Sequence, residues 1–318
     1  MRKIIATTTI NPPTKVLKAH AARSDWHVVV AGDEKTPHHL YDALDNVTYL
    51  HPEDQECLDT QLSDLIGWKC IQRRNMAILK AKQMGAEIIA IIDDDNVPLD
   101  HWGYTFVNTK CRAYNIKTND IAFDPLYATN AGELMWHRGF PLSSVRKRNI
   151  QSITYEEVNV DAQADLWNGE PDIDAYQRAV LNYPNIRIKI ERDDLQFPFT
   201  SNKFIPFNSQ NIFVSADKIR DYFLCPHIGR MDDIWASYYF QAAGNNVVVG
   251  TPSVDSDRDI GTIGRYPIET DIERELIGVK HTSNLLKDLN DGKDKDEVFE
   301  KYLPETSFKA LQRWREIV

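Results

Sequence analysis

The chain has 318 residues, of which 42% are hydrophobic, and a formal net charge of −10 at pH 7. This length suits one large domain or two modest ones, and the hydrophobic fraction is ordinary for a globular protein. The negative charge disfavours general binding to nucleic acid or to an anionic membrane surface. No apolar run approaches the roughly 20 residues that span a bilayer, and the N-terminal one is too short for a secretory signal.

The four cysteines are scattered, without the spacing of a metal site: Cys57, Cys70, Cys111 and Cys225. They predict buried free thiols in a reducing compartment. We therefore expect a cytoplasmic protein, or a chain without its targeting segment.

Strands and helices alternate over the first 92 residues. Apolar, β-branched runs predict strands at 3–10, 26–33, 47–50 and 87–92, and apolar spacing predicts helices at 14–23 and 70–86. Gly85 is a typical end for the second helix. This alternation predicts an α/β fold with a mixed, largely parallel sheet.

The second half of the chain is less regular. Stretches 120–129, 186–191, 207–215 and 245–254 are strand-like, whereas 172–182 and 232–244 are helix-like, with aspartates that suit an N-cap. With no repeat and no linker, residues 1–280 are expected to form one domain. Residues 281–318 read as a charged helical tail whose apolar stripe packs on the body or on a second copy; the stripe is Phe308, Leu311, Trp314 and Ile317.

The strongest chemical signal is the acidic run after the strand at 87–92. In strand geometry Asp93 and Asp95 would share a face and Asp94 would point away. Ligands of open α/β sheets bind beyond the carboxyl ends of strands. Two carboxylates there suit Mg²⁺ or Mn²⁺, which also takes substrate phosphates. A solvated acidic turn is the alternative, and the run alone supports both equally.

Other acidic-motif chemistries fit less well. The run lacks the Gly-Thr turn of aspartyl phosphatases and the glycine and final glutamate of a calcium-binding EF-hand loop. The chain also contains no P-loop, GxGxxG or GxSxG motif.

Three further stretches carry polar chemistry. Asp33 and Lys35 follow a strand and could contact a base, ribose or phosphate, although an ordinary loop explains them equally well. Arg138 could clamp a diphosphate, whereas the neighbouring basic run reads as solvated surface. Asp232 and Asp233 begin a helix, where we expect one to be the N-cap and the other to bind the acceptor or act as general base.

Several motifs together resemble a known family. The segments WHVVVAGDEKTP, IQRRNMAILKAKQMGAEIIAIIDDDN, HRGFPL, NGEPDIDA and PFNSQNIF resemble, in the same order, the STELLO-type glycosyltransferase-like domain. RGFPLS and GRMDDIWAS also resemble the reversibly glycosylated polypeptides, the plant UDP-arabinopyranose mutases. The resemblance runs from about Ile5 to about Asp271 and leaves the tail uncovered.

This resemblance implies a GT-A-like fold with a nucleotide-sugar site and a DxD-type metal site. By this analogy Asp93 lies near the ribose with Asp94 close by, and Asp95 ligates Mn²⁺; Asp93 and Asp95 are the expected metal residues. Arg138 matches the arginine linked to self-glycosylation in the mutases. Asp232 and Asp233 match the acidic pair of the mutases. The expected nucleotide-sugar contacts are Thr8, Asp33, Lys35, Arg74, Asp93, Asp94 and Asn208.

The chain also departs from the mutase pattern. A histidine follows the late strand in the mutases, whereas this chain offers Asp255, Asp257 and Asp259, so the third metal ligand stays open. Asn96 follows the triple aspartate where the mutases have cysteine, and this favours the STELLO-like pattern.

The expectation is thus a glycosyltransferase with Mn²⁺ or Mg²⁺, a UDP-sugar donor and an unknown acceptor. One alternative is a UDP-sugar pyranose/furanose mutase with reversible self-glycosylation. Another is a non-catalytic nucleotide-sugar-binding scaffold. We expect no nucleic acid partner and no membrane span, and a homo-oligomer could form through the C-terminal helix.

Overall fold

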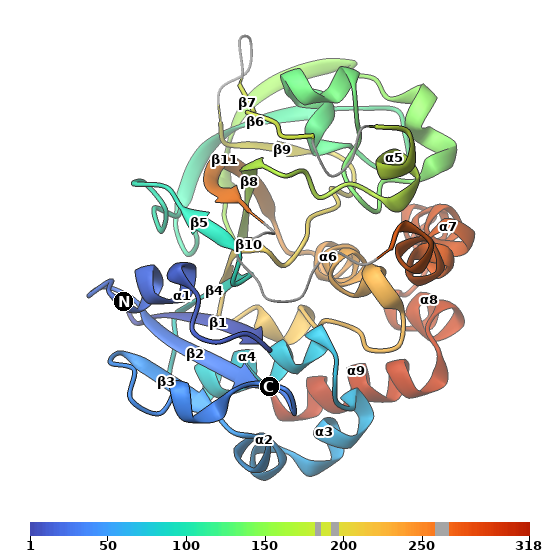
Figure 1. Cartoon of the computed structure of the whole chain (residues 1–318). Coiled ribbons are helices and arrows are strands. Elements are labelled where there is room, and N and C mark those ends of the chain that lie inside the picture. Colours follow the sequence, from blue (N-terminus) through green and yellow to red (C-terminus); the bar gives the residue numbers. More distant parts are fainter. Residues whose placement is uncertain (182–185, 192–196, 258–266) are drawn as a thin grey trace.

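The computed structural model describes residues 1–181, 186–191, 197–257 and 267–318. Within these ranges the chain forms one mixed sheet with the strand order β3-β2-β1-β4-β10-β8-β11-β9-β6-β7, and β5 pairs with β11 (Figure 1). The strands are β1 (Lys3–Thr9), β2 (His27–Gly32), β3 (Val47–Leu50), β4 (Ile88–Ile92), β5 (Asn96–Pro98), β6 (Lys110–Lys117), β7 (Ser152–Asn159), β8 (Ala162–Gly169), β9 (Phe199–Ser201), β10 (Asn211–Ser215) and β11 (Val247–Ser256).

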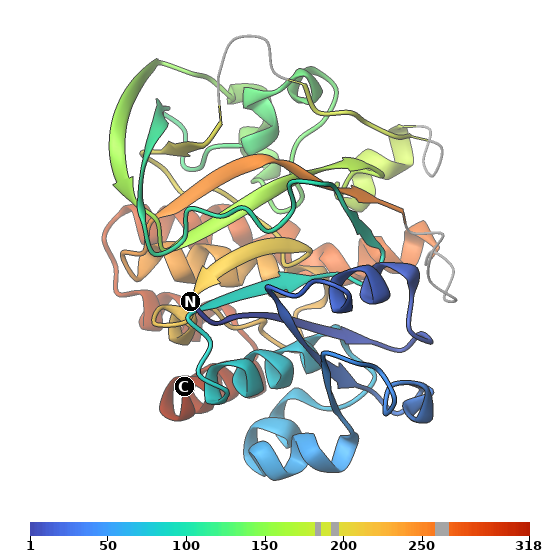
Figure 2. The ribbon, with the colours of Figure 1, turned by 90° about the vertical axis from the view of Figure 1, so that its left-hand side faces the viewer.

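Helices cover both faces of this sheet. They are α1 (Lys15–Ala21), α2 (Pro52–Leu58), α3 (Thr60–Ile66), α4 (Arg74–Gln83), α5 (Ala175–Val180), α6 (Asp232–Ala242), α7 (Ile268–Asn290), α8 (Lys295–Tyr302) and α9 (Glu305–Ile317). In Figure 1, α1 lies to the left of β1 and β4, whereas α6 and α7 lie to their right, and Figure 2 shows the molecule from the α1 side. The mixed α/β fold and its C-terminal helices agree with the sequence prediction.

The N-terminal strands place several loops at one edge of the sheet. β1 is parallel to β2 and β4, and β2 is parallel to β3, so the carboxyl ends of all four strands lie together. β10 runs antiparallel to β4, which brings the residues that precede β10 to the same edge. This edge, where the strand direction changes, is where ligands bind in open α/β sheets.

The alternation of side chains along β1 and β4 builds two cores. Ile4 and Ile91 belong to the core beneath α4 and α6, whereas Ile5 and Ile92 belong to the core on the α1 side. Both faces of these strands are covered, which explains why the sequence of β4 is continuously apolar.

The C-terminal helices pack on the body of the protein. Leu311 and Trp314 of α9 are buried in the α4–α6 core, and the Trp314 ring lies 5.4 Å from that of Phe223. The predicted stripe therefore packs on the chain itself. The expected boundary between residues 280 and 281 falls within α7. In the described ranges no helix is long and apolar enough to cross a membrane.

Some predicted elements are wrong. Residues 120–129 make one bridge, Ala122 to Phe204, before a 3₁₀ turn at Pro125–Ala128, because proline cannot donate to a ladder. Residues 186–191 make only the bridge from Ile188 to Gly169. The thiols are all free, but Cys57 is exposed and so contradicts the expected burial.

One buried carboxyl on the sheet gives a stability prediction. Asp165 of β8 accepts hydrogen bonds from Ser253 Oγ at 2.6 Å and Gln163 Nε2 at 2.7 Å, and burial raises its pKa from 3.8 to about 7. The folded state therefore holds this proton between about pH 4 and 7, where the unfolded state has lost it. Stability from this group is complete below pH 4 and declines as the pH rises toward 7.

We expect Asp165→Asn to remove this decline, of which about 2.7 kcal/mol falls between pH 5 and pH 8 at about 1.36 kcal/mol per pH unit up to the folded pKa. Urea unfolding of both proteins at pH 5 and pH 8 measures it, and groups common to both cancel in the difference. The variant should gain stability over the wild type as the pH rises. An identical pH dependence in the two proteins would contradict the assignment to Asp165.

Candidate active site

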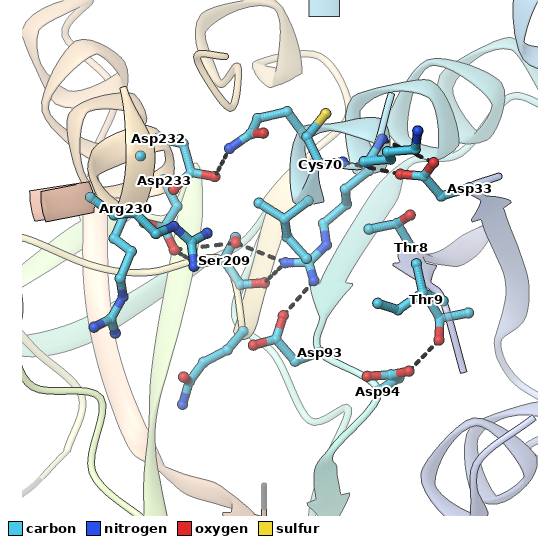
Figure 3. A pocket seen from close by; sticks show the side chains of 18 of the residues that line it. Thr8, Thr9, Asp33, Cys70, Asp93, Asp94, Ser209, Arg230, Asp232 and Asp233 are labelled. Atoms are coloured by element: carbon cyan, nitrogen blue, oxygen red, sulfur yellow. Dashed lines mark hydrogen bonds and ion pairs between the residues drawn. The ribbon is translucent and has the colours of Figure 1, made fainter. Parts of the chain in front are cut away.

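A cavity of 690 Å³ opens at the carboxyl edge of β1, β2 and β4. Its other walls come from the segment before β10, from Gly229–Met231 with the start of α6, and from the start of α7. Figure 3 shows Asp33, Thr8, Thr9 and Asp94 on one side and Arg230 on the other, with Ser209 and Asp93 between them. The volume lies within the range of about 300–1,000 Å³ that is usual for ligand sites.

The structure brings almost all the predicted site residues to this cavity. Asn208 is the exception: it is buried, it is not among the lining residues, and its Nδ2 donates to Asp172 Oδ2 at 2.8 Å. The predicted residues that line the cavity are Thr8, Asp33, Lys35, Arg74, Asp93, Asp94, Asp95, Arg138, Asp232 and Asp233.

The three consecutive aspartates form a turn. β4 ends at Ile92, so the expected alternation of faces does not apply, and Asp94 lines the cavity together with Asp93 and Asp95. Asp94 accepts hydrogen bonds from Thr9 Oγ1 and, at 3.0 Å, from Asn11 Nδ2. Burial raises the pKa of Asp94. Thus β1 holds one aspartate of the run in a fixed position.

Arg74 ties the aspartate turn to the segment before β10. Its buried guanidinium forms an ion pair with Asp93 and donates to Ser209 O at 3.0 Å and to Ser209 Oγ at 2.8 Å. The position at the start of α4 directs this side chain toward the cavity. Arg74 therefore orients Asp93 and supplies positive charge at the centre of the site.

Asp33 anchors a loop that sequence reasoning missed. Its carboxylate accepts from the backbone N–H groups of Glu34 at 2.6 Å and of Lys69 and Cys70, each at 3.0 Å. Trp68 in this loop lines the cavity, and the Arg73 guanidinium lies 3.6 Å from its ring centroid. Asp33 thus contributes to the site by shaping it, whereas the exposed Lys35 can reach a ligand directly.

Arg138 is enclosed by carboxylates. Its Nε lies 3.0 Å from both oxygens of Asp172, and its Nη1 and Nη2 each lie 3.0 Å from Asp233. The residue is 6% exposed. Two bidentate pairs of this kind fix the guanidinium, so Arg138 positions Asp233 and the start of α6.

Asp232 and Asp233 differ in their surroundings. Neither is the N-cap of α6, as we had expected for one of them, because Met231 holds that position and both carboxylates bond elsewhere. Asp233 Oδ2 accepts from Ser209 N at 3.0 Å besides its pair with Arg138. Asp232 Oδ2 accepts from the neutral Gln72 Nε2 at 2.7 Å.

This difference separates the roles of the two aspartates. Burial and the nearby charge of Asp233 raise the pKa of Asp232 to about 7. A carboxyl with such a pKa can take up a proton near neutral pH, which a general base requires. Asp232 is therefore the candidate base, and Asp233 is held in an ion pair.

Four more cavity residues had no role in the sequence analysis. They are Arg178 of α5, Arg230 just before α6, and Asp271 and Arg274 of α7. Arg230 belongs to the motif GRMDDIWAS, but no sequence pattern indicated that it would lie beside residues of α5 and α7. Their meeting is a product of tertiary packing.

The residues at the aspartate turn are suited to a hard divalent cation. Among the described residues no three acidic, histidine or cysteine side chains group as a metal site. Mg²⁺ and Mn²⁺ commonly use one or two carboxylates together with substrate phosphates and water, and the turn offers only oxygen ligands. The expected third ligands do not help: Asp255 and Asp257 are not among the lining residues, and Asp259 lies outside the described residues.

Comparisons with known proteins give little further guidance. No protein-family profile and no curated protein matches the chain. Among solved structures, glucosyl-3-phosphoglycerate synthase from Mycobacterium tuberculosis, in complex with phosphoglyceric acid, matches over 92% of this chain and 80% of that chain. The sequence identity is 10% and the TM-score 0.37. A likeness this distant assigns no residue, and the function has to be inferred from the site itself.

Proposed function

We propose that this chain is a glycosyltransferase of the GT-A type that takes its glycosyl group from a nucleotide sugar, with a UDP-sugar as the donor. The observation that carries the proposal is the opening of the Asp93–Asp95 turn and of Asp232 onto the same cavity. An acidic turn suits a metal-bound diphosphate, and a base with a pKa near 7 suits deprotonation of an acceptor hydroxyl.

In this proposal the donor occupies the cavity beside β1, β2 and β4. Lys35 contacts a phosphate, and Thr8 and the Trp68 loop line the nucleoside portion. Asp95, with Asp93, would hold Mg²⁺ or Mn²⁺. When bound, the ion supplies positive charge to the diphosphate of the donor as it leaves.

The acceptor lies on the opposite side of the aspartate turn. Asp232 receives the proton of the attacking hydroxyl, while Gln72 and the Arg138–Asp233 pair hold that part of α6 in place. Arg138 sits between two carboxylates and is 6% exposed, which argues against it as a self-glycosylation site. This geometry favours a transferase over the mutase alternative.

The metal component is tested by Asp95→Ala. We expect a UDP-sugar with Mn²⁺ to raise the Tm of the wild type, and the variant to lose the metal-dependent part of this shift because a carboxylate ligand is absent. A thermal-shift panel of nucleotide sugars with Mn²⁺, Mg²⁺ or chelator measures the effect. The matched control is Asp100→Ala, which removes an exposed aspartate outside the cavity. If no nucleotide sugar stabilises the wild type with any metal, the proposed function is wrong.

A further inference from the structure

The cavity has an arginine-rich wall opposite the Asp33 side. This wall, called the arginine end below, consists of Arg178, Arg230, Arg274 and Asp271. All three guanidinium groups converge on the one carboxylate of Asp271. Arg178 Nη1 lies 2.7 Å and Arg230 Nη1 3.5 Å from Oδ2, and Arg274 Nη1 lies 3.8 Å from Oδ1.

Within the arginine end itself, three guanidinium groups share one carboxylate, that of Asp271. Arg230 also pairs with Glu275 at 2.7 Å and with Asp172 at 3.1 Å, and Asp172 is shared with Arg138. Among the described residues, the wider network thus joins four arginines to four acidic groups, Asp172, Asp233, Asp271 and Glu275. Glu275 is not among the residues that line the cavity.

The arginines are held in place before any ligand binds. The Arg178 and Arg230 side chains are 3% and 10% exposed, whereas that of Arg274 is 38% exposed. Gly229 packs directly on α7, because a Cβ there would lie 2.0 Å from Arg274 O. Two buried arginines thus lie beside a third that is more exposed, an arrangement that suits forked binding of an oxyanion.

The arginine end is also separate from the expected donor position. Figure 3 shows Arg230 across the cavity from Asp33, Thr8 and Asp94, with Asp93 and Ser209 between. Arg230 precedes Asp232 by two residues in the chain. An anion held at the arginine end would therefore place the rest of its molecule beside the candidate base.

We propose that the arginine end binds the anionic group, a phosphate or a carboxylate, of a small acceptor whose hydroxyl lies at Asp232. This inference rests on the proposed function for the identity of the reaction, but it makes its own statement about binding. It names the acceptor as a charged small molecule and excludes a neutral sugar or an unmodified lipid.

Isothermal titration with three probes tests the inference: sn-glycerol 3-phosphate, glycerate and glycerol, each added to the wild type with and without saturating UDP and Mn²⁺. At least one anionic probe should bind, and glycerol should not. Comparison of sn-glycerol 3-phosphate with glycerate shows whether the arginine end prefers a phosphate or a carboxylate. The preferred probe should bind in the presence of UDP, because the two ligands occupy different parts of the cavity.

The variant Arg274→Gln should weaken binding of that probe about tenfold, the usual size for loss of one charge-assisted hydrogen bond. The control variant Arg112→Gln removes an exposed arginine of β6 outside the cavity and should bind as the wild type does. Arg274 is the most exposed of the three arginines, so its variant should retain the wild-type Tm. UDP binding should be equal in all three proteins.

Three results would overturn the inference: no binding of either anionic probe, undiminished binding by Arg274→Gln, or exclusion of the probe by UDP. Each of these leaves the proposed function standing if UDP-sugar and metal still bind. Conversely, probe binding that depends on Arg274, without any nucleotide binding, would support the arginine end and refute the proposed donor.

Discussion

Arg138→Met should lower the free energy of unfolding by about 3–5 kcal/mol, the usual loss when one partner of a buried ion pair is removed. The variant keeps the apolar stem but leaves Asp172 and Asp233 without their shared guanidinium. Urea unfolding at pH 7 measures the loss.

A second substitution separates charge from packing. Adding Asp233→Asn to Arg138→Met removes the charge of Asp233, whereas Asp172 still pairs with Arg230, so the double variant should recover part of the lost stability. A matched surface change, Arg112→Met on β6, should alter stability by less than about 0.5 kcal/mol. If Arg138→Met lost no more stability than Arg112→Met, the ion pairs of Arg138 with Asp172 and Asp233 would not stabilise the fold.

Asp232→Asn should reduce turnover by about 10²–10⁴-fold, the usual contribution of a positioned general base. The readout is the release of UDP from the donor at saturating concentration. In the wild type, activity should rise with pH around a midpoint near 7, because the base works only when it is deprotonated and its pKa is raised to about 7. In the variant this rise should disappear.

Stability provides the control for Asp232→Asn. Asparagine has nearly the same shape and removes the repulsion from Asp233, so the Tm at pH 8 should equal or exceed that of the wild type. Binding of UDP with Mn²⁺ should be unchanged, because Asp232 lies outside the proposed donor position. Full activity in the variant, or an unaltered pH profile, would remove Asp232 from its proposed role.

The elements that the sequence predicted best are those with a local cause. β4 is a run of five apolar residues, and α5 is preceded by its N-cap Asp174, whose side chain accepts from Gln177 N. One element that it missed, β7, lacks such a signal. β7 is exposed along almost its whole length and is held by pairing with β6, so neither a buried face nor an alternation of apolar residues marks it.

The candidate site was predictable to a similar degree. The residue types at the carboxyl ends of strands pointed to the cavity, since parallel strands must end at one edge. The roles within the cavity were not predictable in the same way. The sequence proposed Arg138 as a phosphate clamp and one of Asp232 and Asp233 as an N-cap, and the structure gives these side chains other partners.

The sequence by itself determined the alternation of strands and helices, the acidic turn after β4 and the family that the chain resembles. Each of these depends on residues that lie close together in the chain. Tertiary structure alone decided which carboxylate is neutralised and which is poised to take a proton. Arg138 meets partners 34 and 95 residues away, and Gln72 reaches Asp232 across 160 residues. Burial and nearby charge set the pKa of a carboxyl, and both arise only when distant segments pack together.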